Sequence, residues 1–355
     1  MTKVLLLGGG KIGTCITALL TATGDYQLTV GDQDQGMLDR LEGNVAKRQL
    51  RFDDAQALRD AVSGHDVVIS AAPFHLTPLI AEAAKDRGAH YFDLTEDVES
   101  TRRVKALAEG AKTAFTPQCG LAPGFISIVG YDLAKRFDEL HTVHMRVGAL
   151  PVYPSNALKY NLTWSTDGLI NEYCNPCEAI HEGELREVLP LEGMEHISLD
   201  GIDYEAFNTS GGLGTLCETL EGKVKFLNYK TVRYPGHRDI VKILVNELQL
   251  GQRRDILKDV LEASIPMTKQ DVVLIFVTAW GKKDGRLMQE TYAKKVYAKE
   301  IGGQLWSAIQ VTTAAGICAM VDLHRAGQLP QSGFVRQEQA NLSDFLANRF
   351  GQHYA

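Results

Sequence analysis

The sequence has no long hydrophobic run. Its longest apolar stretch, Val272 to Trp280, is far shorter than the roughly 20 residues that a helix needs to cross a bilayer. The first three residues lead directly into a strand-like segment, 4–7, without the apolar core and small-residue cleavage site of a secretory signal. We therefore expect a protein that has no membrane partner and is not exported.

The sequence also has few cysteines and fewer basic than acidic residues. Six cysteines in 355 residues do not form a disulfide framework, which favours a reducing, cytoplasmic setting. The net charge is −7, whereas a nucleic-acid-binding protein usually presents a basic face, so we expect no nucleic-acid partner. Hydrophobic residues make up 45% and charged residues 23%, which excludes a disordered or collagen-like chain. At this length, two globular domains are more natural than one.

The first 120 residues alternate between short apolar runs and longer segments with helical spacing. The apolar runs are 3–7, 27–30, 49–52, 66–70, 90–94 and 113–117. Alternation at this interval is typical of βαβ units, and strands that are apolar throughout are typical of a parallel sheet covered on both faces. The sequence therefore predicts an α/β fold whose first domain, residues 1–122, is a Rossmann-type doubly wound parallel sheet.

The pattern changes beyond Gly120. A turn cluster is followed by an apolar helix at about 126–137 and then by segments of alternating hydrophobicity at 142–147, 206–208, 223–232 and 272–280. Such alternation indicates an α+β second domain, residues 123–302, built on a mostly antiparallel sheet. Residues 308–325 form a strongly apolar helical pattern, and we expect 303–355 to return and pack on the first domain.

A glycine fingerprint follows the first strand. Gly8 permits a tight turn, Gly10 lets the backbone approach a pyrophosphate, and Gly13 allows close packing of helix on strand. The intervening Lys11 and Ile12 open the first helix, whose N-terminus offers N–H groups and a positive dipole end to phosphates. The pattern, in this context, predicts a dinucleotide site.

Residues at the ends of later strands complete this cofactor site. Asp32, with the adjacent Gln33, ends the second strand, where a carboxylate accepts hydrogen bonds from the ribose hydroxyls and repels a 2′-phosphate, so NAD is favoured over NADP. Asp53 is either a contact for the adenine or a helix N-cap. Ala71 and Ala72 are small residues that admit the ribose and pyrophosphate.

Longer motifs extend over nearly the whole chain. The most specific are Gly120-Leu121-Ala122-Pro123-Gly124, Thr209-Ser210-Gly211-Gly212 and Arg233-Tyr234-Pro235-Gly236-His237. With them the sequence resembles the saccharopine dehydrogenase-like family, and within it the branch of lysine 6-dehydrogenases. The resemblance implies an NAD-dependent oxidation of the side-chain amine of L-lysine, in which hydride transfer is followed by imine hydrolysis and ammonia release. It also implies a homo-oligomer formed through the second domain.

Two other functions remain open. A saccharopine-type dehydrogenase would act on a secondary amine and would need two further cationic groups, for which Arg146 and Lys159 are candidates. A non-catalytic NAD-binding scaffold or sensor would need no convergent polar residues in the second domain. The Cys174 and Cys177 pair with His181 lacks a second pair of ligands at zinc spacing, so we expect no metal site.

Amine dehydrogenation requires a proton acceptor and a partner for the substrate carboxylate. Asp93 ends the fifth strand and is the candidate acceptor, although an N-cap or a salt bridge is an equal alternative. Arg233 and His237 flank a Pro-Gly turn that would direct both side chains to one place. We expect Arg233 to bind the carboxylate and His237 to serve as a proton shuttle or second carboxylate donor.

Two further pairs are candidates for the substrate site. Tyr160 and Asn161 match a Tyr-Asn pair of the family, which implies that they order the amine or the attacking water. Thr209 and Ser210 offer hydroxyl and backbone N–H groups, which suits an anion-binding nest and equally a tight turn.

Overall fold

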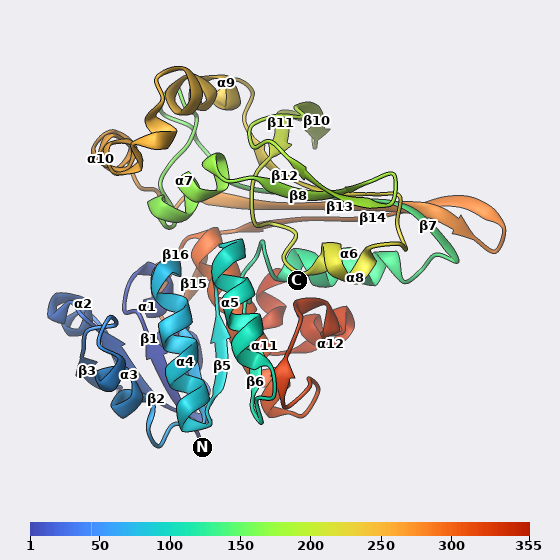
Figure 1. Cartoon of the computed structure of the whole chain (residues 1–355). Coiled ribbons are helices and arrows are strands. Elements are labelled where there is room, and N and C mark those ends of the chain that lie inside the picture. The colour runs from blue at the N-terminus through green and yellow to red at the C-terminus, as the bar shows by residue number, and fades with distance from the viewer. Residues whose placement is uncertain (44) are drawn as a thin grey trace. The chain divides into compact units, whose positions relative to one another are not determined.

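The computed structural model describes residues 1–43 and 45–355. The chain forms two units (Figure 1). The first comprises Met1–Phe125, Glu300–Trp306 and Gln310–Ala355, and the second comprises Ile126–Lys299 and Ser307–Ile309. Within the described residues, no helix has the length and apolar character that a membrane span requires.

The first unit is built on a seven-stranded sheet in the order β17-β6-β5-β4-β1-β2-β3. All neighbouring strands are parallel. The strands are β1 (Thr2–Leu7), β2 (Tyr26–Asp32), β3 (Ala46–Gln49), β4 (Val67–Ser70), β5 (His90–Asp93), β6 (Ala114–Thr116) and β17 (Gly333–Phe334). The strand order reverses at β1 and β4, and the crevice at such a reversal is where open α/β sheets bind ligands. The predicted doubly wound α/β sheet is confirmed.

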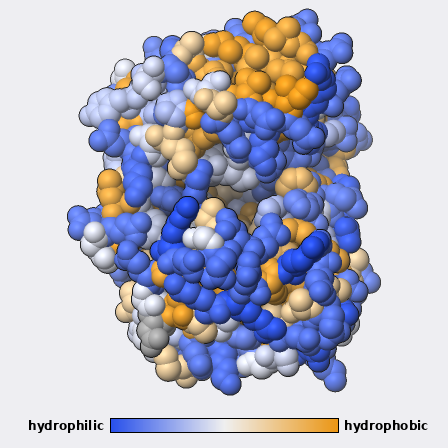
Figure 2. All heavy atoms as spheres, turned by 90° about the vertical axis from the view of Figure 1, so that its left-hand side faces the viewer, coloured by the Kyte–Doolittle hydropathy of each residue, from blue (hydrophilic) through white to orange (hydrophobic). Residues whose placement is uncertain are grey.

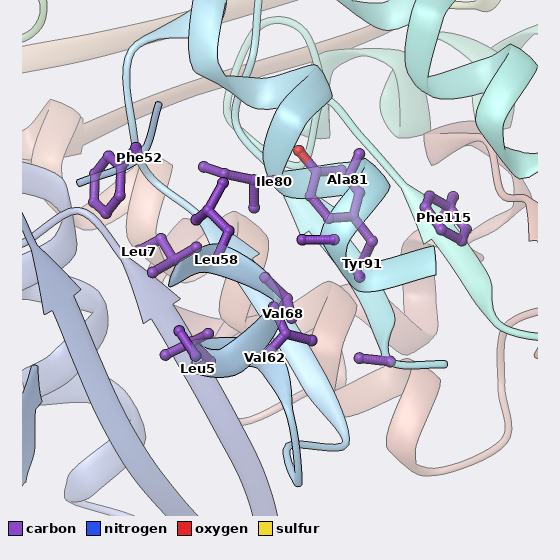
Figure 3. Close-up of a cluster of buried hydrophobic side chains, with 14 of the residues drawn as sticks. Leu5, Leu7, Phe52, Leu58, Val62, Val68, Ile80, Ala81, Tyr91 and Phe115 are labelled. Atoms are coloured by element: carbon purple, nitrogen blue, oxygen red, sulfur yellow. The ribbon is translucent and has the colours of Figure 1, made fainter. Parts of the chain in front are cut away.

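Helices cover both faces of this sheet. They are α1 (Lys11–Thr21), α2 (Gln35–Asp39), α3 (Ala55–Val62), α4 (Thr77–Arg87), α5 (Val98–Ala108), α11 (Ala308–Arg325) and α12 (Leu342–Ala347). Figure 3 shows Leu58 and Ile80, from α3 and α4, directed into one buried apolar cluster with Leu7 and Tyr91. On the other face, the His324 ring of α11 packs against Phe92, with ring centroids 5.5 Å apart.

The second unit contains a mixed sheet in the order β10-β11-β12-β7-β13-β14, with β8 pairing to β12 and β9. Only the β12–β7 pair is parallel among the pairings described, so the expected mostly antiparallel sheet is confirmed. The strands are β7 (Glu139–Pro151), β8 (Cys177–His181), β9 (Glu184–Val188), β10 (Glu195–Leu199), β11 (Ile202–Asn208), β12 (Phe226–Arg233), β13 (Asp271–Lys283) and β14 (Arg286–Tyr297). The short strands β15 (Lys299–Ile301) and β16 (Gln304–Trp306) pair with each other.

Helices of the second unit form two groups. They are α6 (Phe125–Ala134), α7 (Thr166–Cys174), α8 (Leu216–Leu220), α9 (His237–Lys242) and α10 (Arg254–Ser264), with a π-helical turn at Ile243–Glu247. A Cβ at Gly130 of α6 would lie 3.1 Å from Met145 Sδ and 3.3 Å from Leu216 Cδ2, so α6 packs closely on β7 and α8. In the second group, α7 and α10 share an apolar cluster with Phe207.

Exposed apolar side chains gather on the second group of helices. Figure 2 shows a hydrophobic patch in the upper part of the view. The exposed apolar residues of this region are Ile243 in the π-helical turn, Leu248 directly after it, and Ile256 and Val260 in α10.

Candidate functional site

The turn between β1 and α1 requires glycine at two positions and is open at a third. Gly8 has a φ of +112°, and a Cβ there would lie 2.6 Å from the Ala71 carbonyl oxygen. A Cβ at Gly13 would lie 1.8 Å from the Gly8 carbonyl oxygen. By contrast, a Cβ at Gly10 would meet nothing within 4 Å among the described atoms. The backbone at Gly10 is therefore accessible to a ligand at van der Waals distance.

Helix α1 starts at this open position. Gly10 is its N-cap, and no side chain in the described part of the chain caps it. The next residues, Lys11 and Ile12, begin the helix, and the Thr14 N–H is already bonded to the Gly10 carbonyl at 2.9 Å. A helix N-terminus without a side-chain cap favours an anion, because N–H groups and the positive end of the helix dipole face it. The turn therefore fits a pyrophosphate.

Asp32 connects the end of β2 to the glycine turn. Its Oδ2 accepts the Gly9 N–H at 2.6 Å and its Oδ1 accepts the Asp34 N–H at 2.8 Å. The side chain is buried, whereas the neighbouring Gln33 is exposed and its carbonyl accepts a bond from the Gln49 amide at 3.1 Å. The carboxylate thus stands at the strand end where dinucleotide folds bind the ribose.

Asp53 and the two alanines occupy different surroundings. Asp53 forms an exposed ion pair with Arg51 at 2.7 Å, and the N-cap of α3 is the next residue, Asp54, so the N-cap alternative for Asp53 is wrong. Its contact with adenine stays a prediction. Ala71 and Ala72 follow β4 and are half-buried, with the Ala71 N–H donating to the Leu7 carbonyl at 2.8 Å.

Asp93 ends β5 and is buried. Its Oδ1 accepts the backbone N–H groups of Thr95 and Gln118, both at 2.9 Å, and its Oδ2 has no hydrogen-bond partner within the described residues. Burial raises the pKa of this carboxyl to about 6, although the two N–H donors and the nearby Tyr91 hydroxyl act against the rise. Ser70, its register partner on β4, likewise has an unpartnered hydroxyl in the described structure. A buried carboxyl with one unoccupied oxygen can accept a proton from a ligand.

Arg233 ends β12 and is also buried. Its Nε donates to the Tyr173 hydroxyl at 3.1 Å, its Nη1 donates to the Val232 carbonyl at 2.9 Å, and its guanidinium lies 4.9 Å from the centre of the Tyr160 ring. No carboxylate among the described residues forms an ion pair with it, although the charge of Glu172 acts on it. A buried cation without an ion-pair partner suits an anionic ligand.

His237 begins α9 and is held at both ring nitrogens. Nδ1 lies 2.7 Å from the Leu158 carbonyl and Nε2 lies 3.0 Å from the Tyr173 hydroxyl. A carbonyl only accepts, so Nδ1 carries the proton and Nε2 accepts from Tyr173. Burial and the charge of Arg233 lower the pKa of His237 to about 3, so the ring is neutral at physiological pH.

Tyr160 and Asn161 lie in a buried loop. The Tyr160 hydroxyl accepts a hydrogen bond from Trp164 Nε1 at 3.0 Å, and burial raises its pKa despite the opposing charge of Arg233. Asn161 Nδ2 donates to the Pro266 carbonyl at 3.0 Å, while its Oδ1 has no partner among the described residues. The structure thus brings Tyr160 together with Arg233, and leaves Asn161 with one free acceptor.

Thr209 and Ser210 follow β11. The Ser210 hydroxyl donates to the Pro176 carbonyl at 2.8 Å and its N–H donates to the Glu172 carbonyl at 3.0 Å. Two donors of the expected nest are therefore already used within the chain. Thr209 Oγ1 is buried without a partner in the described structure. The donors that remain at this turn are fewer than the sequence suggested.

Arg146 and Lys159 are the candidates for the two extra cations that a saccharopine-type substrate would need. Arg146 is paired with Glu195, which also binds Lys230 at 2.8 Å. Lys230 lies beside Arg146 in register, and Arg233 is three residues further along β12, so Arg146 and Arg233 are on opposite faces of the sheet. Arg146 and Lys230 share the single carboxylate of Glu195 on the face opposite to Arg233, so Arg146 does not extend the site around Arg233. Lys159 Nζ donates to the Pro235 carbonyl at 2.9 Å.

Two residues of the candidate site were not predicted from the sequence. Tyr173, in α7, contacts both Arg233 and His237, but no motif around it in the sequence indicates this role. Glu205, on β11, accepts the N–H groups of Gly236 at 2.8 Å and Arg238 at 2.6 Å, which fixes the backbone on both sides of His237. A glutamate between apolar residues in a buried strand was the available signal.

No group of three or more histidine, cysteine or acidic residues is arranged to hold a metal ion in the part of the chain that the structure describes. Cys177 is buried and Cys174 is half-buried, and both are free thiols.

Comparison with known families matches almost all of the chain. Residues 120–352 match the description "Saccharopine dehydrogenase C-terminal domain", and residues 4–116 match "Saccharopine dehydrogenase NADP binding domain". The first unit therefore contains an NAD(P)-binding domain. A solved structure of similar fold is the apo saccharopine dehydrogenase (L-Glu forming) of Saccharomyces cerevisiae, with a TM-score of 0.78, 17% identity and coverage of 99% of this chain and 98% of that chain.

Two curated proteins are also similar. The mitochondrial alpha-aminoadipic semialdehyde synthase of Bos taurus is 23% identical over 319 residues, covering 83% of this chain and 33% of that protein. The saccharopine dehydrogenase (NADP(+), L-glutamate-forming) of Pyricularia oryzae is 22% identical over 298 residues, covering 79% of this chain and 65% of that protein. The chain spans only 27% to 33% of the length of the first curated relatives it matches.

Proposed function

The chain belongs to the saccharopine dehydrogenase family, and from this premise we propose that it is an NAD-dependent oxidoreductase that oxidises the side-chain amine of L-lysine. The observation that carries the proposal is the buried Arg233, a cation without an ion-pair partner in the described residues, packed against the Tyr160 ring. Its free edge suits the carboxylate of an amino acid.

The glycine turn and Asp32 support NAD rather than NADP. The residues from Asp32 to Gly36 include two aspartates and no lysine or arginine. A 2′-phosphate near Asp32 would meet a carboxylate that already holds the Gly9 N–H, and two like charges repel. Although the matching domain description and the Pyricularia relative name NADP, this strand end favours a free 2′-hydroxyl.

Asp93 is the proposed proton acceptor. An amine has a pKa of about 10.4 and must lose a proton before its carbon can release a hydride. The unpartnered Oδ2 of Asp93 can take that proton, since the carboxyl ionises above a pKa of about 6. NAD, when bound, supplies the hydride acceptor. We propose that Tyr160 and Asn161 order the amine or the attacking water, and that Thr209 contributes its free hydroxyl.

A saccharopine-type activity is the second candidate, and the names of the relatives favour it. Its substrate carries additional carboxylates, which need additional cations. Arg146 lies on the face of the sheet opposite to Arg233, and this leaves Lys159 as the remaining candidate. The side chains therefore support lysine better than saccharopine.

The test is NADH or NADPH formation, followed by absorbance, with L-lysine, saccharopine and 1,5-diaminopentane. We expect turnover of L-lysine with NAD. Turnover of saccharopine alone would favour the second candidate, and NAD binding without turnover of any amine would favour a non-catalytic protein.

Arg233→Met extends this test to the carboxylate. The KM for L-lysine should rise about 100-fold, because a charge-assisted hydrogen bond is lost, whereas the KM for 1,5-diaminopentane should stay unchanged. Arg146→Met is the matched control, since it removes a buried arginine from the other face of the sheet. An equal effect of Arg233→Met on both substrates would remove Arg233 from the carboxylate site.

A further inference from the structure

Three buried side chains from three elements form one hydrogen-bonded line in the second unit. Arg233 comes from the end of β12, Tyr173 from α7 and His237 from the start of α9. The Tyr173 hydroxyl lies 3.1 Å from Arg233 Nε and 3.0 Å from His237 Nε2. The line ends at the Leu158 carbonyl, 2.7 Å from His237 Nδ1.

The chemistry of its two ends fixes the direction of this line. Arginine only donates and a carbonyl only accepts, so every hydrogen bond runs from Arg233 towards Leu158. Tyr173 therefore accepts from Arg233 and donates its single proton to His237. In the other tautomer, the lone pair of His237 Nδ1 would face the lone pairs of the Leu158 carbonyl oxygen. The hydroxyl proton of Tyr173 would then have no acceptor at Nε2.

We propose that Tyr173 is a positioning residue that orients Arg233 towards the carboxylate of the substrate, and that His237 is the acceptor that orients Tyr173 rather than a proton shuttle. The proposal rests on the proposed function for the identity of the ligand. It follows from the hydrogen bonds: Nε and Nη1 of Arg233 are used within the chain, whereas Nη2 has no partner among the described residues.

The surroundings hold each member of the line in place. The Arg233 guanidinium lies 4.9 Å from the centre of the Tyr160 ring and 5.9 Å from that of Tyr173, so both rings restrict it. Glu205 accepts the N–H groups on either side of His237, so the imidazole starts from a fixed backbone. A guanidinium held in this way loses less entropy when it binds a ligand.

The state of His237 agrees with an acceptor role. Burial and the charge of Arg233 lower its pKa to about 3, so Nε2 keeps its lone pair for Tyr173 across the physiological range. Both ring nitrogens are already bonded within the chain, and neither is left for a substrate proton.

Tyr173→Phe tests the proposal through the KM. The phenylalanine keeps the ring against Arg233 and removes the hydroxyl that holds its Nε. We expect the KM for L-lysine to rise about tenfold with a smaller change in kcat, and the KM for 1,5-diaminopentane to stay unchanged. Tyr204→Phe is the control, because Tyr204 is a buried tyrosine stacked on Tyr234. Its neighbour Glu205 is in register with Arg233, so Tyr204 lies on the face of the sheet opposite to Arg233. An unchanged KM for L-lysine in Tyr173→Phe would overturn the proposal.

A second measurement on the unmodified full-length protein needs neither a variant nor turnover. Nitrogen NMR of ¹⁵N-labelled histidine reports which ring nitrogen of His237 carries the proton, and assignment uses a His237→Gln sample. We expect a neutral ring protonated at Nδ1, and protonation at Nε2 would overturn the proposal. If no amine is oxidised but the Nδ1 tautomer is found, the proposed function fails while the hydrogen-bonded line stands.

Discussion

Asp93 combines burial with two backbone hydrogen bonds, and these act on its pKa in opposite directions. Burial prevails and raises the pKa from 3.8 to about 6, so the ionised carboxyl destabilises the folded state. The protonated carboxyl is the form that the fold favours. Its contribution to stability is fully present below pH 3.8 and is lost as the pH rises through about 6.

Asp93→Asn should reveal this cost. The amide keeps an oxygen that can accept from both Thr95 and Gln118 but cannot ionise. The variant should therefore gain up to roughly 3 kcal/mol of unfolding free energy over the wild type at about pH 8, with little gain at about pH 4. Urea unfolding at the two pH values measures this, and turnover should fall while NAD affinity is kept.

Asp53→Asn serves as the control for that experiment, because Asp53 is exposed and ion-paired and should show no such gain at high pH. A gain in Asp93→Asn that is equally large at both pH values would contradict the assignment of the raised pKa to Asp93.

At the scale of elements, the β1–α1 turn separates two kinds of glycine. Gly10→Ala adds a methyl group where the described structure has no atom within 4 Å, so the unfolding free energy should change by only a few tenths of a kcal/mol. The same methyl group stands where a pyrophosphate would approach, so NAD affinity should fall at least about tenfold. Gly13→Ala would instead place Cβ 1.8 Å from the Gly8 carbonyl oxygen and should destabilise the fold by several kcal/mol.

Calorimetric titration with NAD and urea unfolding of the two variants check this pair of outcomes. Wild-type NAD affinity in a stably folded Gly10→Ala would show that the pyrophosphate does not lie at this turn.

At the scale of the whole molecule, the last part of the chain returns to the first unit. Asp322 of α11 accepts a hydrogen bond from the Tyr26 hydroxyl of β2 at 2.6 Å and from Arg349 Nη2 at 2.8 Å. Arg349 also binds Asp25, so residues about 300 positions apart in sequence share one charged cluster. This cluster fixes α11 and the C-terminal segment to the start of β2.

Asp322→Asn should weaken this connection. Burial raises the pKa of Asp322, but hydrogen bonds from Tyr26 and Arg349 outweigh it and hold the pKa below 3.8. Its stabilising effect is therefore present above pH 3.8 and is lost as the pH falls through the lower value of the folded state. We expect Asp322→Asn to lower the unfolding free energy by about 2 kcal/mol at neutral pH, with a smaller deficit in acid.

Urea unfolding with Asp344→Asn as the control measures the effect, since Asp344 is an exposed acidic residue of α12. A deficit in Asp322→Asn that grows as the pH falls would contradict the role of the ionised Asp322.

Local pattern was sufficient for most of the fold. Short apolar runs that alternate with segments of helical spacing indicated the parallel sheet, and the glycine spacing indicated the first turn, because both depend on neighbours along the chain. Strand β3 was expected at 49–52 but lies at Ala46–Gln49, and all four of its residues are exposed. A polar edge strand is formed by backbone pairing with β2, which hydrophobicity does not report.

Some residues of the candidate site could be predicted from the sequence, and others could be found only in the structure. Arg233 and His237 stood out because a short turn lies between them, and Asp93 because it ends a strand. Tyr173 and Glu205 act from other elements, and nothing adjacent in sequence indicates their partners. The sequence by itself determined the parallel sheet and the open glycine turn, whereas only the tertiary structure decided which charges are neutralised, since an ion pair or a buried hydrogen bond depends on atoms that folding alone brings within reach.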